Sequence, residues 1–210
     1  MSRSVNTHDT IHNNTDSADS ADSADPADSD DYEYPTKEDM NEFRLKLIDE
    51  MLQDKNKQNL DLSYLELEEL PDLSEFTNLK SLVISNNYIS QIDNLPPTII
   101  KLYCANNDLK QLNNLPPGLI FLDCSGNSIT QLDFLPITLI ELYCFRNRLT
   151  QIDNLPPGLK LLDCADNYIT QLNNLPASVE SLHCVMNRFT YDFEPTLENI
   201  RLHLQLANSK

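Results

Sequence analysis

Five cysteines stand at one position of a repeating pattern, so their chemistry is the first question the sequence raises. The set is Cys104, Cys124, Cys144, Cys164 and Cys184. A metal site would need paired ligands such as C-x-x-C, and a disulfide framework would need varied spacing in an exported chain. The regular spacing therefore predicts a buried ladder of small apolar thiols in a reducing compartment, without a metal ion or other cofactor.

A nucleophilic site is conceivable where serine, histidine and aspartate come together near the end of the repeats. His183 precedes Cys184 directly, and alternation along a strand puts these two side chains on opposite faces. Ser181 and His183 share a face, but roughly 6.5 Å between their Cα atoms exceeds the contact that a nucleophile and its base need. We expect no enzymatic activity and interpret Asp163 with His183 as a surface pair.

A second ladder consists of asparagines that follow the five cysteines, and Ile84 at the equivalent position, by three residues. Amide side chains at such a turn supply partners for backbone groups that would otherwise be buried without hydrogen bonds. We expect a structural role for all six: Asn87, Asn107, Asn127, Asn147, Asn167 and Asn187.

These residues belong to a repeat of twenty residues that runs from Leu95 to the region of Phe193. Each unit begins with Leu-Pro and contains L-x-x-L-x-C-x-x-N-x-L, and two looser units precede the first regular one. A fixed short period predicts a solenoid, in which each unit buries its apolar side against its neighbours. The alternation around each cysteine predicts one short strand per unit, and the prolines predict an extended return limb rather than a helix.

The flanking segments differ from the repeats. Residues 1–35 hold nine acidic residues and one basic residue in a run of Asp-Ser-Ala triplets, which predicts a disordered acidic tail. Residues 36–56 carry an apolar stripe at helical spacing, comprising Met40, Phe43, Leu47, Ile48, Met51 and Leu52. We expect this amphipathic helix to cap repeats that span residues 57–196, and residues 197–210 to form a degenerate C-terminal capping repeat.

The repeat resembles that of the leucine-rich repeat family, whose strand motif is L-x-x-L-x-[LC]-x-x-N-x-L. The twenty-residue length and leading Leu-Pro are most similar to the bacterial-type class found in the YopM and IpaH effectors, and the Asn-rich units with Cys also resemble repeat proteins of giant DNA viruses. The resemblance implies an α/β solenoid, mainly β, with a parallel concave sheet of seven or eight short strands. It further implies protein binding on the concave face.

The outward strand positions are richer in aromatic and apolar residues than solvent alone would require. Aromatic and apolar residues interspersed with carboxylates have the composition of an interface core. We expect a partner to bind here, with the aspartates selecting basic residues on it. The predicted partner-binding residues are Tyr103, Phe121, Asp123, Tyr143, Phe145, Leu161, Asp163 and His183.

The overall charge narrows the class of partner. The net charge is −18, of which residues 36–210 contribute −10, so we expect the chain to be a poor binder of nucleic acid, which associates with clustered Lys and Arg. No segment predicts export or a membrane span, so we expect a cytoplasmic protein, in the host cytoplasm if the source is viral. A monomer is favoured. The alternative is a structural protein that assembles with itself or packages other components, for example by pairing its acidic tail with the edge formed by Arg146, Arg148 and Arg188.

Overall fold

The computed structural model describes residues 34–209, so the predicted acidic tail lies almost entirely outside the described residues. The described part consists of seven short strands between two helices. In chain order the elements are α1 (Lys37–Leu52), β1 (Asn59–Asp61), β2 (Ser81–Val83), β3 (Lys101–Tyr103), β4 (Phe121–Asp123), β5 (Glu141–Tyr143), β6 (Leu161–Asp163), β7 (Ser181–His183) and α2 (Leu197–Asn208).

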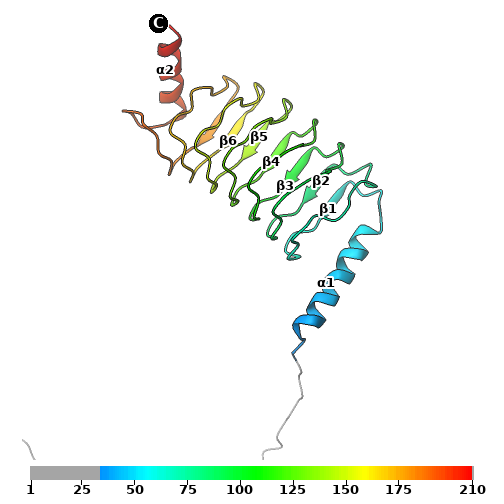
Figure 1. Ribbon diagram of the computed structural model, residues 1–210. Coiled ribbons are helices and arrows are strands. Elements are labelled where there is room, and N and C mark those ends of the chain that lie inside the picture. The colour runs from blue at the N-terminus through cyan, green and yellow to red at the C-terminus, as the bar shows by residue number, and fades with distance from the viewer. Residues whose placement is uncertain (1–33, 210) are drawn as a thin grey trace, which may run out of the picture. The chain divides into compact units, whose positions relative to one another are not determined.

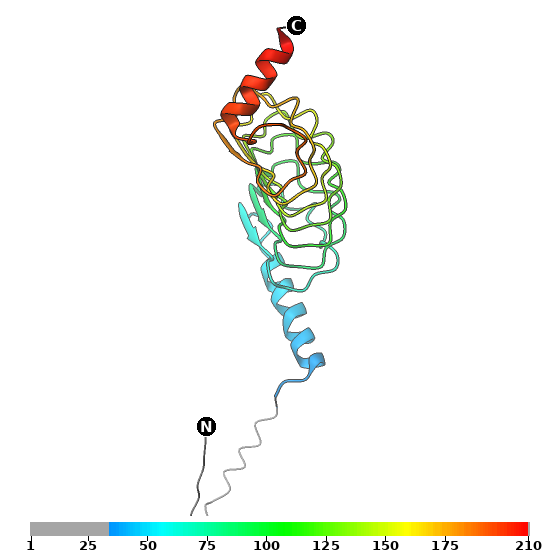
Figure 2. The ribbon, with the colours of Figure 1, turned by 90° about the vertical axis from the view of Figure 1, so that its left-hand side faces the viewer.

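The strands form one parallel sheet in the order β1 to β7 (Figure 1). From β2 onward each residue pairs with the residue twenty positions later, as Leu102 does with Leu122. Figure 2 shows the strands along one side of the coil and the irregular return limbs along the other. The predicted leucine-rich repeat solenoid is therefore confirmed, and the strand side is called the strand face below.

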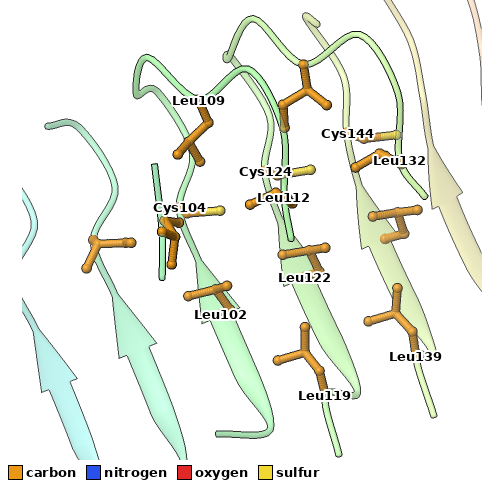
Figure 3. Packing of buried hydrophobic residues seen from close by; sticks show 14 of the residues in the cluster. Leu102, Cys104, Leu109, Leu112, Leu119, Leu122, Cys124, Leu132, Leu139 and Cys144 are labelled. Carbon is orange, nitrogen blue, oxygen red and sulfur yellow. The ribbon is translucent and has the colours of Figure 1, made fainter. Parts of the chain in front are cut away.

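The core consists of side chains that repeat in register from one turn of the solenoid to the next. The central residue of each strand from β1 to β6, such as Leu122, is buried. Figure 3 shows these leucines stacked beside the cysteines and the leucines of the return limbs. Because every turn contributes the same small set of apolar groups, neighbouring turns pack at a constant spacing.

The asparagine ladder ties each turn to the one before it. Asn147 accepts a hydrogen bond from the backbone N–H of Ile129 at 3.0 Å. Its amide donates to the carbonyls of Cys124 and Cys144 at 3.0 and 3.1 Å. The other five asparagines of the ladder make corresponding bonds, so they satisfy backbone groups on both sides of each turn.

Two left-handed residues bend the chain in most turns of the solenoid. One directly precedes the ladder asparagine, as Arg146 does with φ of 53°. The other precedes the Leu-Pro pair, as Asn154 does with φ of 55°. The proline then opens a tight turn, in which the N–H of Leu159 donates to the carbonyl of Pro156 at 3.0 Å. No helix or strand forms in the return limbs between β1 and β7, as the prolines predict.

Helix α1 contributes apolar contacts to the first turn of the solenoid from its C-terminal half, and Arg44 forms an ion pair with Glu66 at 2.6 Å. Ile48 is buried, and Leu47, Met51 and Leu52 pack partly against the core. The side chains of Met40 and Phe43 at the other end of the predicted stripe are exposed. About two helical turns of the stripe therefore cover the end of the core, and the apolar side chains of its N-terminal part are exposed to solvent.

The C-terminal segment differs from the prediction. Residues 197–210 were expected to restart the repeat, but Leu197–Asn208 forms α2 and there is no eighth strand in the described chain. Thr196 caps the helix by accepting the N–H of Asn199 at 3.2 Å, and Ile200 is fully buried. In the register of the repeat, Gln205 occupies the position of the turn asparagine, whereas the leucines of the segment also fit a helical period.

Aromatic side chains cover the last turn together with α2. The rings of Phe189 and Tyr191 stack at 5.4 Å, and those of Tyr191 and Phe193 stack at 4.6 Å. His203 of α2 contacts the last two rings. The hydroxyl of Tyr191 also accepts the N–H of Leu172 at 2.7 Å. This stack shields the apolar end of the solenoid, which no further turn covers.

Candidate functional site

The predicted partner-binding residues occupy parallel rows on the strand face. The central row runs through register partners Tyr103, Asp123, Tyr143, Asp163 and His183 on β3 to β7. The row beside it, on the same face, consists of Lys101, Phe121, Glu141, Leu161 and Ser181. Adjacent members of a row are about 4.8 Å apart, so aromatic and acidic side chains alternate within contact range.

Three rings from three consecutive strands form one cluster. The ring centroids of Tyr103 and Phe121 lie 4.6 Å apart at an interplanar angle of 35°. Those of Phe121 and Tyr143 lie 5.5 Å apart at 37°. All three side chains are half-buried, so part of each ring stays accessible on the strand face. This aromatic cluster joins residues that are twenty and forty positions apart in the sequence.

Asp123 lies between the two tyrosines and is held in one orientation. Its Oδ1 accepts the backbone N–H of Ser125 at 3.1 Å and the Ser125 hydroxyl at 2.6 Å. Among the described residues no donor contacts its Oδ2 and no basic side chain pairs with it. The carboxylate is therefore rigid but keeps one oxygen for an external donor.

The same turn geometry recurs at other aspartates of the central row. Asp163 accepts the backbone N–H of Ala165 at 3.2 Å. At the N-terminal end of the sheet, Asp61 accepts the N–H and hydroxyl of Ser63 at 2.9 and 2.6 Å. Asp61 has Val83 rather than an aromatic residue as its register partner. Aspartates at this position thus have a structural role in the turn as well as a charge on the strand face.

Tyr143 lies within the field of these carboxylates. Partial burial raises the pKa of its hydroxyl above the ordinary value, and the charges of Glu141, Asp163 and Asp123 raise it further. The outward residues of β2 to β6 include these three acidic residues and one lysine, Lys101. The strand face around the aromatic cluster is therefore negative and favours a positively charged ligand.

The remaining predicted residues surround this centre. Leu161 and Phe145 are half-buried, and Leu161 pairs in register with Glu141 and Ser181. No ring contact in the described chain joins Phe145 to the aromatic cluster. His183 is exposed on the last strand. The structure therefore brings Tyr103, Phe121 and Tyr143 into direct contact, whereas the others form its margin.

The structure places Ser181, His183 and Asp163 as the strand alternation predicted, with the serine and the histidine two residues apart on one face of a strand. Ser181 and His183 are the outward ends of β7, and Asp163 is the register partner of His183. The ion pairs among the described residues do not include Asp163 with His183, and Oδ1 of the aspartate accepts the backbone N–H of Ala165 in its own turn. The predicted surface pair is therefore absent from the described chain as an ion pair, although the two residues are neighbours.

The five thiols are unpaired and lie in the core. Their side chains are fully buried except that of Cys184, which is 4% exposed. Burial raises the pKa of each thiol, to about 11 for Cys184 and further for the others. The thiolate that would serve as a nucleophile or a metal ligand is thus strongly disfavoured.

Two exposed features were not identified from the sequence. Arg188 stacks over the ring of Tyr168 at 4.2 Å, and Arg146 pairs with Asp166 at 3.6 Å, so two of the three edge arginines have partners. Phe134 and Ile137 are exposed in the return limb, where other turns have asparagine and proline or alanine. Comparing the repeats position by position would have found this departure.

Residues 34–209 contain neither a group of potential metal ligands nor a helix that could cross a membrane. No three histidine, cysteine or acidic side chains in that range lie together in a way that could hold a metal ion. None of the helices there has the length and apolar character that crossing a membrane requires.

No protein-family model matches the sequence, and no curated protein sequence does either. Solved structures do resemble it. YopM from Yersinia enterocolitica WA-314 matches with a TM-score of 0.64 and 31% identity over 79% of this chain and 36% of that one, so the chain spans about a third of its length. A Shigella effector LRR domain matches with a TM-score of 0.57 and 26% identity over 83% of this chain and 85% of that one.

A third match concerns the thiols. The functional domain of InlJ from Listeria monocytogenes, which includes a cysteine ladder, has a TM-score of 0.52 and 26% identity over 70% of this chain and 38% of that one. A ladder of five buried cysteines is also present here. With its twenty-residue repeats and single parallel sheet, the chain has the fold of the leucine-rich repeat proteins.

Proposed function

We propose that this chain is a non-catalytic interaction module that binds a protein partner on its strand face. The observation that carries the proposal is the aromatic cluster of Tyr103, Phe121 and Tyr143, partly accessible and bordered by carboxylates without ion-pair partners in the described chain. Aromatic anchors near the centre of a patch dominate binding energies in protein interfaces. The similarity to effector LRR domains supports the same function.

The charge of the face defines the partner. Glu141, Asp123 and Asp163 surround the cluster, so a partner segment with lysine or arginine associates faster and more selectively than a neutral or acidic one. The five free thiols favour a reducing compartment, and we propose the cytoplasm as the place of this interaction.

The test uses the full chain as bait for a random peptide library displayed on phage. The retained peptides are then titrated against the Tyr143→Ala/Phe145→Ala variant. We expect a loss of at least about 2 kcal/mol, or about thirtyfold in affinity, if these side chains are anchors. Because Tyr143 contacts the Phe121 ring, we also expect a small loss of stability, about 1 kcal/mol.

Phe134→Ala is the matched control, since Phe134 is an exposed aromatic residue outside the strand face. Retained peptides should bind this variant with unchanged affinity. If they bind the Tyr143→Ala/Phe145→Ala variant fully and lose affinity for Phe134→Ala, the strand face is not the binding surface and the proposal is wrong.

A further inference from the structure

The last strand of the sheet, β7, has backbone donors without acceptors on the side away from β6. In the preceding turn, the N–H of Cys164 donates to the carbonyl of His183 at 2.8 Å. The equivalent N–H of Cys184 has no hydrogen-bond acceptor among the described residues. The same is true of the N–H of Met186, whereas the N–H of Asp166 one turn earlier is bonded at 2.9 Å.

Backbone acceptors are also free on this side. The carbonyl of Lys160 accepts the N–H groups of Glu180 and Ser181 at 2.7 and 3.1 Å, but no donor in the described chain reaches the carbonyl of Glu180. Because Ser181 and His183 bond toward β6, the alternation of a parallel ladder directs the N–H and carbonyl of Leu182 away from it. Donors and acceptors therefore alternate along residues 180–186, which are called the open edge below.

The side chains along the open edge are accessible. Leu182 is half-buried, whereas the central leucine of every earlier strand is buried. Val185 and Met186 are 66% and 75% exposed, and His183 is exposed as well. Neither α2 nor the aromatic stack of the last turn therefore covers this edge.

Helix α2 nevertheless limits what can bind beside β7. Ile200 is fully buried against the end of the core, and Arg201 donates to the carbonyls of Ala177 and Val179 in the return limb. A complete solenoid turn, from a second copy or from another repeat protein, would need the space that α2 fills. A single extended segment needs only the strand edge.

We infer that the open edge binds an extended segment of a partner protein, which adds an eighth strand to the sheet. This surface goes beyond the proposed function, since it uses backbone groups of the last turn rather than the aromatic cluster. Edge strands that avoid such pairing carry lysine, proline or inward-pointing charges, and residues 181–187 contain no proline, lysine, arginine or acidic residue. Extended peptides bind free edges through main-chain hydrogen bonds, while side-chain contacts give specificity.

The register of the sheet defines the side chains of the segment. The residue opposite Leu182 faces the core side, and the residue opposite Val185 faces the same side as the strand face. Both should be apolar, because they cover apolar side chains that are now partly exposed. Residues 160–166 of this chain meet this requirement on the other side of β7, where Leu162 is the register partner of Leu182.

The experiment therefore uses a synthetic peptide that copies residues 160–166, with Cys164→Ser and blocked termini. It is titrated into the full chain and followed by NMR and amide hydrogen exchange. We expect a dissociation constant of about 0.1–1 mM. The amides of Leu182 and Met186 should exchange at least about tenfold more slowly when the peptide is bound, because their N–H groups gain acceptors.

Two N-methylated isomers of the peptide separate backbone pairing from side-chain contact. An extended segment directs alternate N–H groups to its neighbour, so methylation at even positions and at odd positions should give opposite results. One isomer should bind like the parent peptide, and the other should bind at least about tenfold more weakly. Equal affinities of the two isomers would overturn the inference.

Variants of the chain locate the binding. Val185→Lys places a charge on the open edge and should weaken binding at least about tenfold, whereas Ile137→Lys makes the same kind of change at an exposed apolar residue of a return limb and should leave it unchanged. Equal effects of the two lysines, or no protection of the edge amides up to about 5 mM peptide, would contradict the inference.

Two further outcomes concern other occupants. If the edge amides are already protected in the free chain and light scattering gives twice the mass of the chain, a second copy occupies the edge and the inference is wrong. The Tyr143→Ala/Phe145→Ala variant should bind the peptide as the unchanged chain does. Failure at the open edge therefore leaves the proposed function on the strand face intact, and failure of that function leaves the open edge intact.

Discussion

Arg201 of α2 donates a hydrogen bond from Nη2 to the backbone carbonyl of Ala177 at 2.9 Å, and the same nitrogen also contacts the carbonyl of Val179. These carbonyls are equivalent to those of Pro117 and Leu119, which accept the hydroxyl of Thr138 in the following turn at 3.0 and 2.8 Å. The last turn has no following turn. Arg201 therefore supplies the donors that a further repeat would supply.

Replacing Arg201 should loosen the C-terminal end of the solenoid. Arg201→Ala leaves two carbonyls without their charged donor, so we expect a loss of about 1.5–3 kcal/mol in the free energy of unfolding. Urea unfolding measures this loss, and hydrogen exchange should show it first in β7 and α2. Arg201→Lys keeps a charged donor group and should recover part of the loss. An unchanged midpoint for Arg201→Ala would mean that other contacts hold α2.

A ladder asparagine in the middle of the solenoid should contribute more to the free energy of unfolding than the last ladder asparagine does. Asn147 is buried and bonds to backbone groups of four residues, so Asn147→Ala should cost about 2–4 kcal/mol as those groups lose their partners. Asn187 makes similar bonds but is only half-buried, and its replacement should cost less. Thermal unfolding measures the loss of stability in each variant. Equal losses for the replacements of Asn147 and Asn187 would show that burial of the side chain does not determine the loss.

The native thiols should react slowly, and Cys184 should react first. The thiolate is the reactive form, and burial raises the pKa of all five thiols, least for Cys184. A short pulse of iodoacetamide at pH 8, followed by peptide mass spectrometry, should label less than about one thiol per molecule. Rapid labelling of Cys104, Cys124 or Cys144 in the folded protein would contradict their burial.

Stability should fall in alkaline solution because of the same thiols. Each thiol has a folded pKa above the ordinary value of 9.0, so the unfolded chain ionises first as the pH rises. The contribution is complete below pH 9 and is lost at about 1.4 kcal/mol per pH unit per thiol, until the pH passes the folded pKa, about 11 for Cys184. Denaturant unfolding between pH 8 and 10.5 measures the slope. Cys124→Ala removes one thiol and should make that slope shallower; an identical slope would assign the effect to other groups.

Phe134 should be replaceable by asparagine with a gain in stability. It adopts φ of 58°, where the equivalent Asn94, Asn114 and Asn154 have φ of 54° to 57°, and its side chain is 93% exposed. Asparagine tolerates the left-handed region better than a bulky residue, so Phe134→Asn should add about 0.5–1 kcal/mol. Thermal unfolding beside Phe134→Ala, which does not gain this tolerance, separates relief of strain from loss of the ring. A lower midpoint for Phe134→Asn would show that the ring contributes to folding.

The arrangement of the repeats could be predicted from the sequence because it depends on a period. Leu102 and Cys104 recur every twenty residues with a turn asparagine three residues on, and a chain that repeats this unit can bury it only by stacking. At the ends the period stops, and the sequence did not decide between a further strand and a helix. The spacing of Leu197, Ile200 and Leu204 suits a helix, and the cap of Thr196 and the reach of Arg201 to the last turn favour α2.

The composition of the strand face also followed from alternation, since Tyr103, Asp123 and Tyr143 are outward residues at one position of the repeat. Tertiary structure decided which of these side chains touch. The ring of Phe121 reaches both tyrosines, whereas Asp163 bonds to its own turn rather than to His183. Strand spacing sets which residues are neighbours, but rotamers and competing backbone donors set their contacts, and a repeat pattern carries no information about either.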